Sequence, residues 1–262
     1  MAGRIIYKKP REIETMREAG HILSRTLAEL RQAARPGVST QELNDLAYTR
    51  ITQAGGRPSF LRYRGFPATI CASLNEEVVH GIPSPERRLQ EGDLFKVDLG
   101  VRLRGLHADS ALTVAVGEVS SRARELMEVT HRALWRGLAA ARAGNRLTDI
   151  SRAIQEWVES HGFSVVRELV GHGVGRHLHE EPQVPNFVEG KQRNPRLSPG
   201  MTLAIEPMVN AGSREVETLE DDWTVVTADR QLSAHYEHTV AITREGPEVL
   251  TLGPHEPEPC WE

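Results

Sequence analysis

The sequence is short of cysteine and of long apolar runs, and each shortage excludes a class of protein. Among its 262 residues the only cysteines are Cys71 and Cys260. Two cysteines exclude a disulfide framework and a zinc site made of cysteine alone. No apolar run approaches the ~20 residues that a membrane-spanning helix needs, and the N-terminus lacks the apolar core of a signal peptide. We therefore expect a cytoplasmic protein with no membrane partner.

A strong excess of charge of one sign is also missing. The formal net charge is −4, with lysine and arginine scattered along the chain, so nothing favours a specific nucleic-acid partner. Hydrophobic residues make up 39% of the chain and charged residues 26%, which is the usual composition of a globular protein. Nothing in the sequence demands an assembly, and we expect a monomer.

What the chain does contain is a pattern that occurs twice. Apolar residues at helical spacing predict a pair of helices in each half, and glycines break and then end each pair. The breaks at Gly37 and Gly144 lie 107 residues apart, as do the ends at Gly55 and Gly162. Two matched helix pairs indicate a duplicated, pseudo-twofold domain. The predicted helices cover residues 10–31, 39–55, 126–140 and 150–162.

Strand-like runs follow each helix pair, and Gly100 separates the first two of them as a predicted turn. Helices followed by antiparallel strands, twice over, predict an α+β fold in which helices cover one face of a curved antiparallel sheet. We expect one domain over residues 1–252, with halves of about 1–118 and 119–252, and a proline-rich tail over 253–262. The predicted strands cover residues 94–99, 101–105, 110–116, 201–206 and 238–243.

Four acidic residues lie in or against these apolar strands: Asp98, Asp109, Glu206 and Glu237. Burying a carboxylate without a partner costs several kcal/mol. Each acid could meet its own arginine or lie in water at a strand end. The alternative is that all four, at positions related by the repeat, share a common cation.

The stretch GHGVGRHLHEEP (171–182) supplies histidines to match the acids, with His172 and His179 as candidate ligands or proton carriers. Its closely spaced glycines disfavour a helix and suit tight bends or close backbone approaches. Four carboxylates and a histidine are too many ligands for one tetrahedral zinc. They suit two divalent ions bridged by carboxylates, an arrangement that activates water for hydrolysis.

Several separated motifs together resemble one family. The stretches GHGVGRHLHEEPQVPN (171–186), VDLGVRLRGLHADSALTVAVG (97–117), AIEPMVNAG (204–212) and SAHYEHTVAIT (233–243) are similar to type I methionine aminopeptidases. KKPREIETMREAG (8–20) and CASLNEEVVHGIP (71–83) fit as well. The resemblance covers about residues 5–250, and it implies a pita-bread fold with pseudo-twofold symmetry.

The resemblance implies a dinuclear site that holds Co, Mn, Fe or Zn. Asp98 would bind one ion with both oxygens, and Asp109 and Glu237 would bridge the two ions. His172 and Glu206 would complete the second ion, and Glu206 would also act as general base and acid. These residues all lie within the motifs quoted above.

The resemblance also implies residues that contact the substrate. His80 would meet the scissile nitrogen, and His179 would stabilise the oxyanion. The pocket for the methionine side chain falls on Tyr63, Phe66, Cys71 and Trp223. The backbone carbonyls of Asn75, Glu77 and Ser233 match a site for one monovalent cation, Na or K.

The activity that the resemblance implies is removal of the initiator methionine from nascent proteins and peptides, with a preference for a small second residue. Water activated by the two metals would be the nucleophile, and transient contact with the ribosome would suit such an enzyme. Two alternatives stay open. One is an X-Pro aminopeptidase or prolidase of the same fold, and the other is a binding homologue that has lost catalysis.

Overall fold

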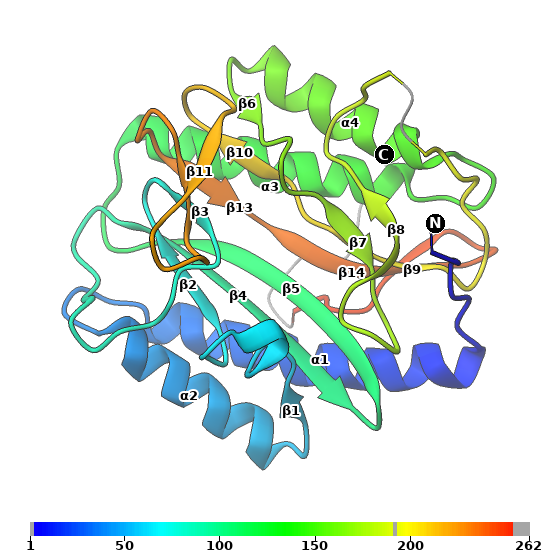
Figure 1. The fold of residues 1–262 in the computed structure, drawn as a ribbon, viewed down its shortest axis with the longest axis horizontal. Coiled ribbons are helices and arrows are strands. Elements are labelled where there is room, and N and C mark those ends of the chain that lie inside the picture. Colours follow the sequence, from blue (N-terminus) through cyan, green and yellow to red (C-terminus); the bar gives the residue numbers. More distant parts are fainter. Residues whose placement is uncertain (1–2, 191–192, 254–262) are drawn as a thin grey trace.

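The helices form in two pairs, one in each half of the chain, as the repeat predicts (Figure 1). A computed structural model describes residues 3–190 and 193–253. The helices are α1 (Pro10–Ala33), α2 (Thr40–Gln53), α3 (Ser121–Ala140) and α4 (Leu147–Ser160). Pro10 lies in the first turn of α1, where a missing N–H costs no hydrogen bond. At the start of α2, Ser39 and Glu42 form a reciprocal capping box.

A curved antiparallel sheet spans both helix pairs, which cover one of its faces (Figure 1). Its main path runs in the order β1-β4-β5-β14-β9-β7-β8, while β2 pairs with β4 and β15 pairs with β14. The strands from the two halves meet where β5 pairs with β14, at Glu237 opposite Ala111. The bounds are β1 (Arg57–Pro58), β2 (Cys71–Leu74), β4 (Leu94–Leu103), β5 (Leu106–Ala115), β7 (Gly171–Gly173), β8 (Glu180–Val184), β9 (Thr202–Ile205), β14 (Glu237–Ile242) and β15 (Pro247–Val249).

Two small sheets flank the large one, and strands from residues 207–234 contribute to both. One sheet has the order β13-β10-β6 and the other has the order β11-β12-β3. A single-turn helix, η1 (Tyr63–Gly65), precedes β2. The bounds of the small strands are β3 (Glu77–Val79), β6 (Ser164–Val165), β10 (Met208–Asn210), β11 (Val216–Thr218), β12 (Val225–Thr227) and β13 (Ser233–His235).

Alternation along the strands decides which face of the sheet each side chain occupies. Phe95, Val97 and Leu99 of β4 pack against α1 and α2 in one apolar core. Leu203 of β9 and Val240 of β14 pack with α3 and α4 in another. The intervening residues, including Asp98, therefore face away from the helices. The helix-covered sheet confirms the predicted fold class.

The predicted turn at Gly100 is wrong. Strand β4 continues through Gly100, and the chain turns at Arg104 and Gly105, which both have positive φ. A Cβ on Gly100 would lie 2.7 Å from Ser59 Cβ, and Ser59 N donates to Gly100 O. Glycine inside a strand therefore marks a close approach of another segment here, which is its other common meaning.

The predicted proline-rich tail cannot be compared with the structure over most of its length. The predicted tail lies outside the described residues from position 254 onward. Among the helices of the described ranges, none is long and apolar enough to cross a membrane.

Candidate active site

Five neighbouring strands of the large sheet each present one of the predicted ligands. Across the sheet, the strand order β4-β5-β14-β9-β7 places the five side chains in one row. All five line a single cavity of about 210 Å³. In the same order, these residues are Asp98, Asp109, Glu237, Glu206 (directly after β9) and His172.

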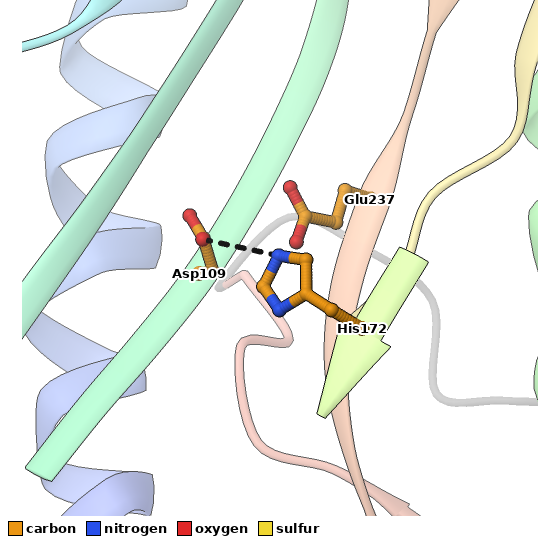
Figure 2. A group of neighbouring side chains, drawn as sticks. All are labelled: Asp109, His172 and Glu237. Atoms are coloured by element: carbon orange, nitrogen blue, oxygen red, sulfur yellow. Dashed lines mark ion pairs between the residues drawn. The ribbon is translucent and has the colours of Figure 1, made fainter. Parts of the chain in front are cut away.

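The three central residues converge closely. Figure 2 shows Asp109, His172 and Glu237 pointing toward one another from three strands, and their ligand atoms all lie within 4.8 Å of one another. His172 Nδ1 lies 2.9 Å from Gly173 O, an acceptor, so Nδ1 carries the hydrogen. His172 Nε2 is then left with its lone pair, 3.5 Å from Glu206 Oε1 and 4.0 Å from Asp109 Oδ2. This tautomer suits a metal ligand.

The buried carboxylates lack the partners that structural acids have. Asp98 Oδ1, Asp109 Oδ1 and Glu237 Oε1 are buried and have no hydrogen-bond partner within the described part of the chain. None of the four acids forms an ion pair with a lysine or arginine of that part. Native proteins leave few buried polar atoms unpaired. The arrangement therefore favours a shared cation and disfavours separate arginine partners.

The electrostatics of the cluster agree with this reading. Burial raises the pKa of Asp109 to about 7. Burial, together with the neighbouring acids, also raises the pKa values of Asp98, Glu206 and Glu237 well above their usual range. Burial lowers the pKa of His172 to about 4, so its imidazole is neutral at pH 7. Divalent cations would relieve the repulsion and bind a ready imidazole, so these residues fit the predicted metal ions.

An apolar wall adjoins the charged cluster. All four predicted pocket residues, Tyr63, Phe66, Cys71 and Trp223, line the same cavity. The Phe66 and Trp223 rings meet edge to face, with centroids 5.1 Å apart. Such a wall suits a flexible apolar side chain, and a thioether sulfur gains from aromatic contacts.

The two predicted non-ligand histidines, His80 and His179, both line this cavity. The His179 ring lies tilted against the ring of His172, with centroids 4.2 Å apart, and its Nδ1 lies 2.8 Å from Tyr63 Oη. Burial at the cavity wall and the nearby His172 lower the pKa of His179 to about 3. His80 has a positive φ of 62°, a strained conformation that is common at functional sites. Burial also lowers the pKa of His80.

The glycines of residues 171–175 allow the close approaches that the sequence suggested. A Cβ on Gly171 would lie 2.4 Å from Ala204 O, and one on Gly173 would lie 2.4 Å from Glu181 O. The following turn is fixed from outside by a buried ion pair of 2.5 Å between Lys8 and Glu180. The side chain of His177 is exposed, and it is not among the residues that line the cavity.

Several cavity residues were not predicted. Phe60 and Leu178 complete the apolar wall, and Arg64 stands beside Tyr63. Outside the set of lining residues, His235 is buried with neither ring nitrogen hydrogen-bonded within the described residues, and its Nε2 lies 3.7 Å from Glu206 Oε2. The sequence could have indicated His235, because only one residue separates it from the predicted ligand Glu237. The remaining unpredicted lining residues are Val79, Leu169, Val170 and Met208.

The carbonyls predicted for a monovalent cation lie away from the cavity. The Lys96 Nζ atom donates to Asn75 O at 2.7 Å and to Ser233 O at 3.1 Å. Asn75 O also accepts a hydrogen bond from Ser233 N. Because a carbonyl oxygen offers two lone pairs, Asn75 O is already fully used, and the Lys96 amine occupies the point that a cation bound to both Asn75 O and Ser233 O would need.

Comparisons with known proteins agree with the geometry. The model of metallopeptidase family M24 matches residues 14–244. Methionine aminopeptidase 1 of Bacillus subtilis is 53% identical, and the match covers 94% of this chain and 99% of that protein. The crystal structure of methionine aminopeptidase from Thermotoga maritima superposes with a TM-score of 0.92 at 44% identity, covering 95% of this chain and 99% of that one.

A more distant structure shares only the fold. The Xaa-Pro dipeptidase from Bacillus anthracis superposes with a TM-score of 0.77 at 24% identity, covering 95% of this chain and 63% of that one. At this level of identity, the similarity supports a shared fold but says nothing about a shared substrate.

Proposed function

The chain belongs to metallopeptidase family M24 and, within it, to the methionine aminopeptidases, and we propose on that basis that it removes N-terminal methionine from peptides and nascent proteins. The observation that carries the proposal is one cavity with two chemically different ends. Five potential ligands form one end, and an apolar wall of suitable chemistry for methionine forms the other.

The strand order supports the division of the ligands between two ions. Asp98 lies at one end of the row and would hold one ion, while Glu206 and His172 lie at the other end and would hold the second. Asp109 and Glu237 stand between them and would bridge. When bound, such ions supply a water that ionises near neutral pH. We propose Co, Mn, Fe or Zn for this pair of sites.

The protein's own groups then handle the proton and the developing charge. Glu206 would take a proton from the attacking water and give it to the leaving amine. With Tyr63 Oη donating to His179 Nδ1, the hydrogen of His179 is on Nε2, where it can be donated to the substrate oxygen. His80 lines the same cavity and would face the scissile nitrogen.

The remaining features follow from the proposed substrate. A nascent chain offers its N-terminal methionine with the next residue directly beside the metal ligands, so a small second residue suits the site best. We propose a monomeric, cytoplasmic enzyme that contacts ribosomes transiently. The domain of residues 1–252, with its two halves, would supply the whole site.

The test is a comparison of peptides with the metal-loaded protein. With Mn or Co present, we expect methionine to be released from Met-Ala-Ser and X-Pro peptides to stay intact. Cleavage of X-Pro peptides would favour the prolidase alternative, which so far shares only the fold. Metal binding without cleavage of either substrate would favour a binding homologue.

A second prediction concerns Tyr63. The Tyr63→Phe variant keeps the ring and loses the hydroxyl that contacts His179. We expect kcat for methionine release to fall about fivefold, the equivalent of one hydrogen bond of about 1 kcal/mol, while KM changes little. Phe66→Leu is the matched control, since it trims the apolar wall and should raise KM. A Tyr63→Phe variant with raised KM and unchanged kcat would contradict the assigned role.

A further inference from the structure

Lys96 is a buried lysine that the proposed mechanism does not use. It lies on β4 two residues before Asp98, on the same face, and only 2% of it is exposed. Fully buried lysines are rare unless they have an anionic partner. Within the described residues, Lys96 forms no ion pair with a carboxylate, and its printed contacts are two backbone carbonyls. The burial of Lys96 without an anionic partner is therefore unusual and needs a physical explanation.

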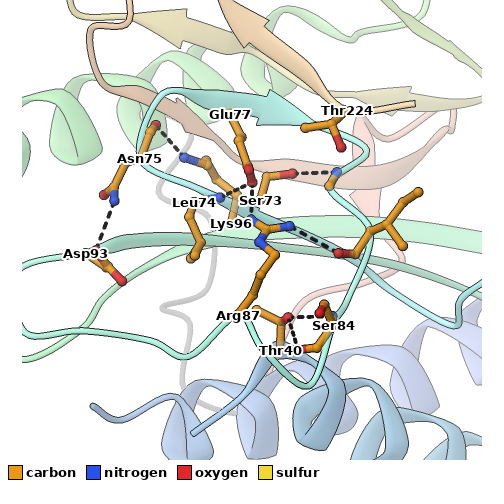
Figure 3. A network of polar contacts seen from close by, with 12 residues as sticks. Thr40, Ser73, Leu74, Asn75, Glu77, Ser84, Arg87, Asp93, Lys96 and Thr224 are labelled. Atoms are coloured by element: carbon orange, nitrogen blue, oxygen red, sulfur yellow. Dashed lines mark hydrogen bonds and ion pairs between the residues drawn. The ribbon is translucent and has the colours of Figure 1, made fainter. Parts of the chain in front are cut away.

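The geometry around the nitrogen is that of a cation site. The carbonyls of Asn75 and Ser233 come from segments far apart in sequence and meet at one buried point, which the Lys96 Nζ atom occupies. Figure 3 shows the Lys96 side chain reaching Asn75 at the turn between β2 and β3. Convergent backbone carbonyls are also what proteins use in place of the hydration shell of a small monovalent ion.

The contacts hold in either protonation state of the amine. Burial lowers the pKa of Lys96 to about 7, and the Glu77 and Glu76 carboxylates act in the opposite direction. Both carbonyls can only accept, so each needs one N–H. A neutral amine offers two and an ammonium offers three, so both hydrogen bonds can form in each case.

The position of Lys96 connects three segments that lead to the candidate site. Its own strand carries Asp98. The turn at Asn75 leads through β3 to His80, and Asn75 is itself held by a 2.9 Å hydrogen bond from its Nδ2 to Asp93 Oδ1. Ser233 begins β13, which leads to Glu237. A group at this point therefore sets how the turn and β13 sit against β4.

We propose that the Lys96 amine is a built-in substitute for a monovalent cation, so that this protein needs neither Na⁺ nor K⁺ to hold these segments together. Lys96 is then a positioning residue for Asp98, His80 and Glu237. Only the effect on catalysis rests on the function proposed above. The effect on stability belongs to the fold alone.

The test uses two variants of the full-length protein, Lys96→Ser and Lys96→Met. Lys96→Ser opens the carbonyl site to an ion, while Lys96→Met fills the same space without a donor or a charge. Thermal unfolding of metal-free protein, prepared with sodium-free chelator, is measured in NaCl, KCl and choline chloride at equal ionic strength. This readout does not depend on methionine release, so its failure is distinguishable from failure of the proposed function.

We expect the wild type to unfold at the same temperature in all three salts. Lys96→Ser should unfold at a lower temperature in choline and regain stability in NaCl or KCl, whereas Lys96→Met should stay destabilised in every salt. With divalent metal added, methionine release by Lys96→Ser should fall about tenfold to a hundredfold in choline, as expected for displaced catalytic groups, and recover in NaCl or KCl.

Two outcomes would overturn the proposal. One is wild-type protein that is stabilised by Na⁺ or K⁺ over choline, because the ion would then still bind. The other is a Lys96→Ser variant that neither salt rescues, because Lys96 would then be an ordinary packing residue. If Lys96→Ser does not fold in choline, its refolding yield from urea in the three salts gives the same comparison.

Discussion

Replacing Asp109 by asparagine is expected to reduce metal-dependent methionine release by at least about a thousandfold, because several kcal/mol of catalysis depend on the metal ions. Asp109 stands inside the row of ligands, between Asp98 and Glu237. It also belongs to the group whose ligand atoms converge within 4.8 Å. A neutral amide in this place would weaken both proposed ions at once.

The loss should not come from unfolding. Asparagine has nearly the shape of aspartate, and Asp109 Oδ1 has no hydrogen bond in the described residues that the change could break. The measurement is steady-state release of methionine from Met-Ala-Ser over a titration with Mn, beside unfolding in urea. The matched control is Asp222→Asn, which removes one negative charge at an exposed turn of positive φ where asparagine is well tolerated.

Each result of this experiment has a clear reading. If Asp222→Asn keeps wild-type activity and Asp109→Asn loses it while staying folded, the bridging role is supported. An Asp109→Asn variant that still releases methionine within tenfold of the wild type, at saturating metal, would show that this carboxylate is not a shared ligand.

Local chemistry made much of this site predictable. The acids stood out because each lies in or against an apolar strand, where an unpaired carboxylate is costly. Ser39 and Glu42 mark the start of α2 through contacts only three residues apart. The glycines between 171 and 175 similarly indicated close backbone contacts. In each case the informative interaction is short-range or is forced by burial.

Other features depend on partners that are distant in sequence. Gly100 looked like a turn because its close neighbour, Ser59, belongs to a segment some forty residues earlier. Nothing in the sequence singled out Lys96, since the carbonyl of Ser233 that accepts from it lies 137 positions away. The order of β14, β9 and β7 is likewise set by non-local pairing, which periodicity does not encode.

The stabilisation that divalent metal gives to this protein is expected to increase as the pH is raised from 6 to 8. Metal ions bind carboxylates only after protons leave them. Burial raises the pKa of Asp109 to about 7 and those of Asp98, Glu206 and Glu237 well above their usual range. At pH 6 the folded, metal-free cluster is therefore largely protonated, and metal must displace those protons. At pH 8 more of them have already left.

The same pKa values set how the free energy of unfolding of the metal-free protein changes with pH. Between pH 3.8 and about 7, folded protein keeps a proton on Asp109 that the unfolded chain has released, so rising pH lowers the free energy of unfolding. Over this whole pH range, the difference between the two pKa values lowers the free energy of unfolding by about 4 kcal/mol. His172 acts in the opposite direction below pH 6.5, because its folded pKa is lowered to about 4. Comparison with Asp109→Asn cancels the contributions of groups that do not interact with Asp109, whereas loss of the Asp109 charge also lowers the pKa values of Asp98, Glu206 and Glu237.

Urea unfolding at a series of pH values, with chelator and with Mn, measures both effects. Without metal, Asp109→Asn should match the wild type near pH 4 and become progressively more stable than the wild type up to pH 8, because asparagine mimics the protonated acid. With Mn, the wild type should gain stability at pH 8 and the variant should gain far less. A gap between the two metal-free proteins that does not change with pH would mean that Asp109 ionises normally, and that its burial imposes no need for a cation.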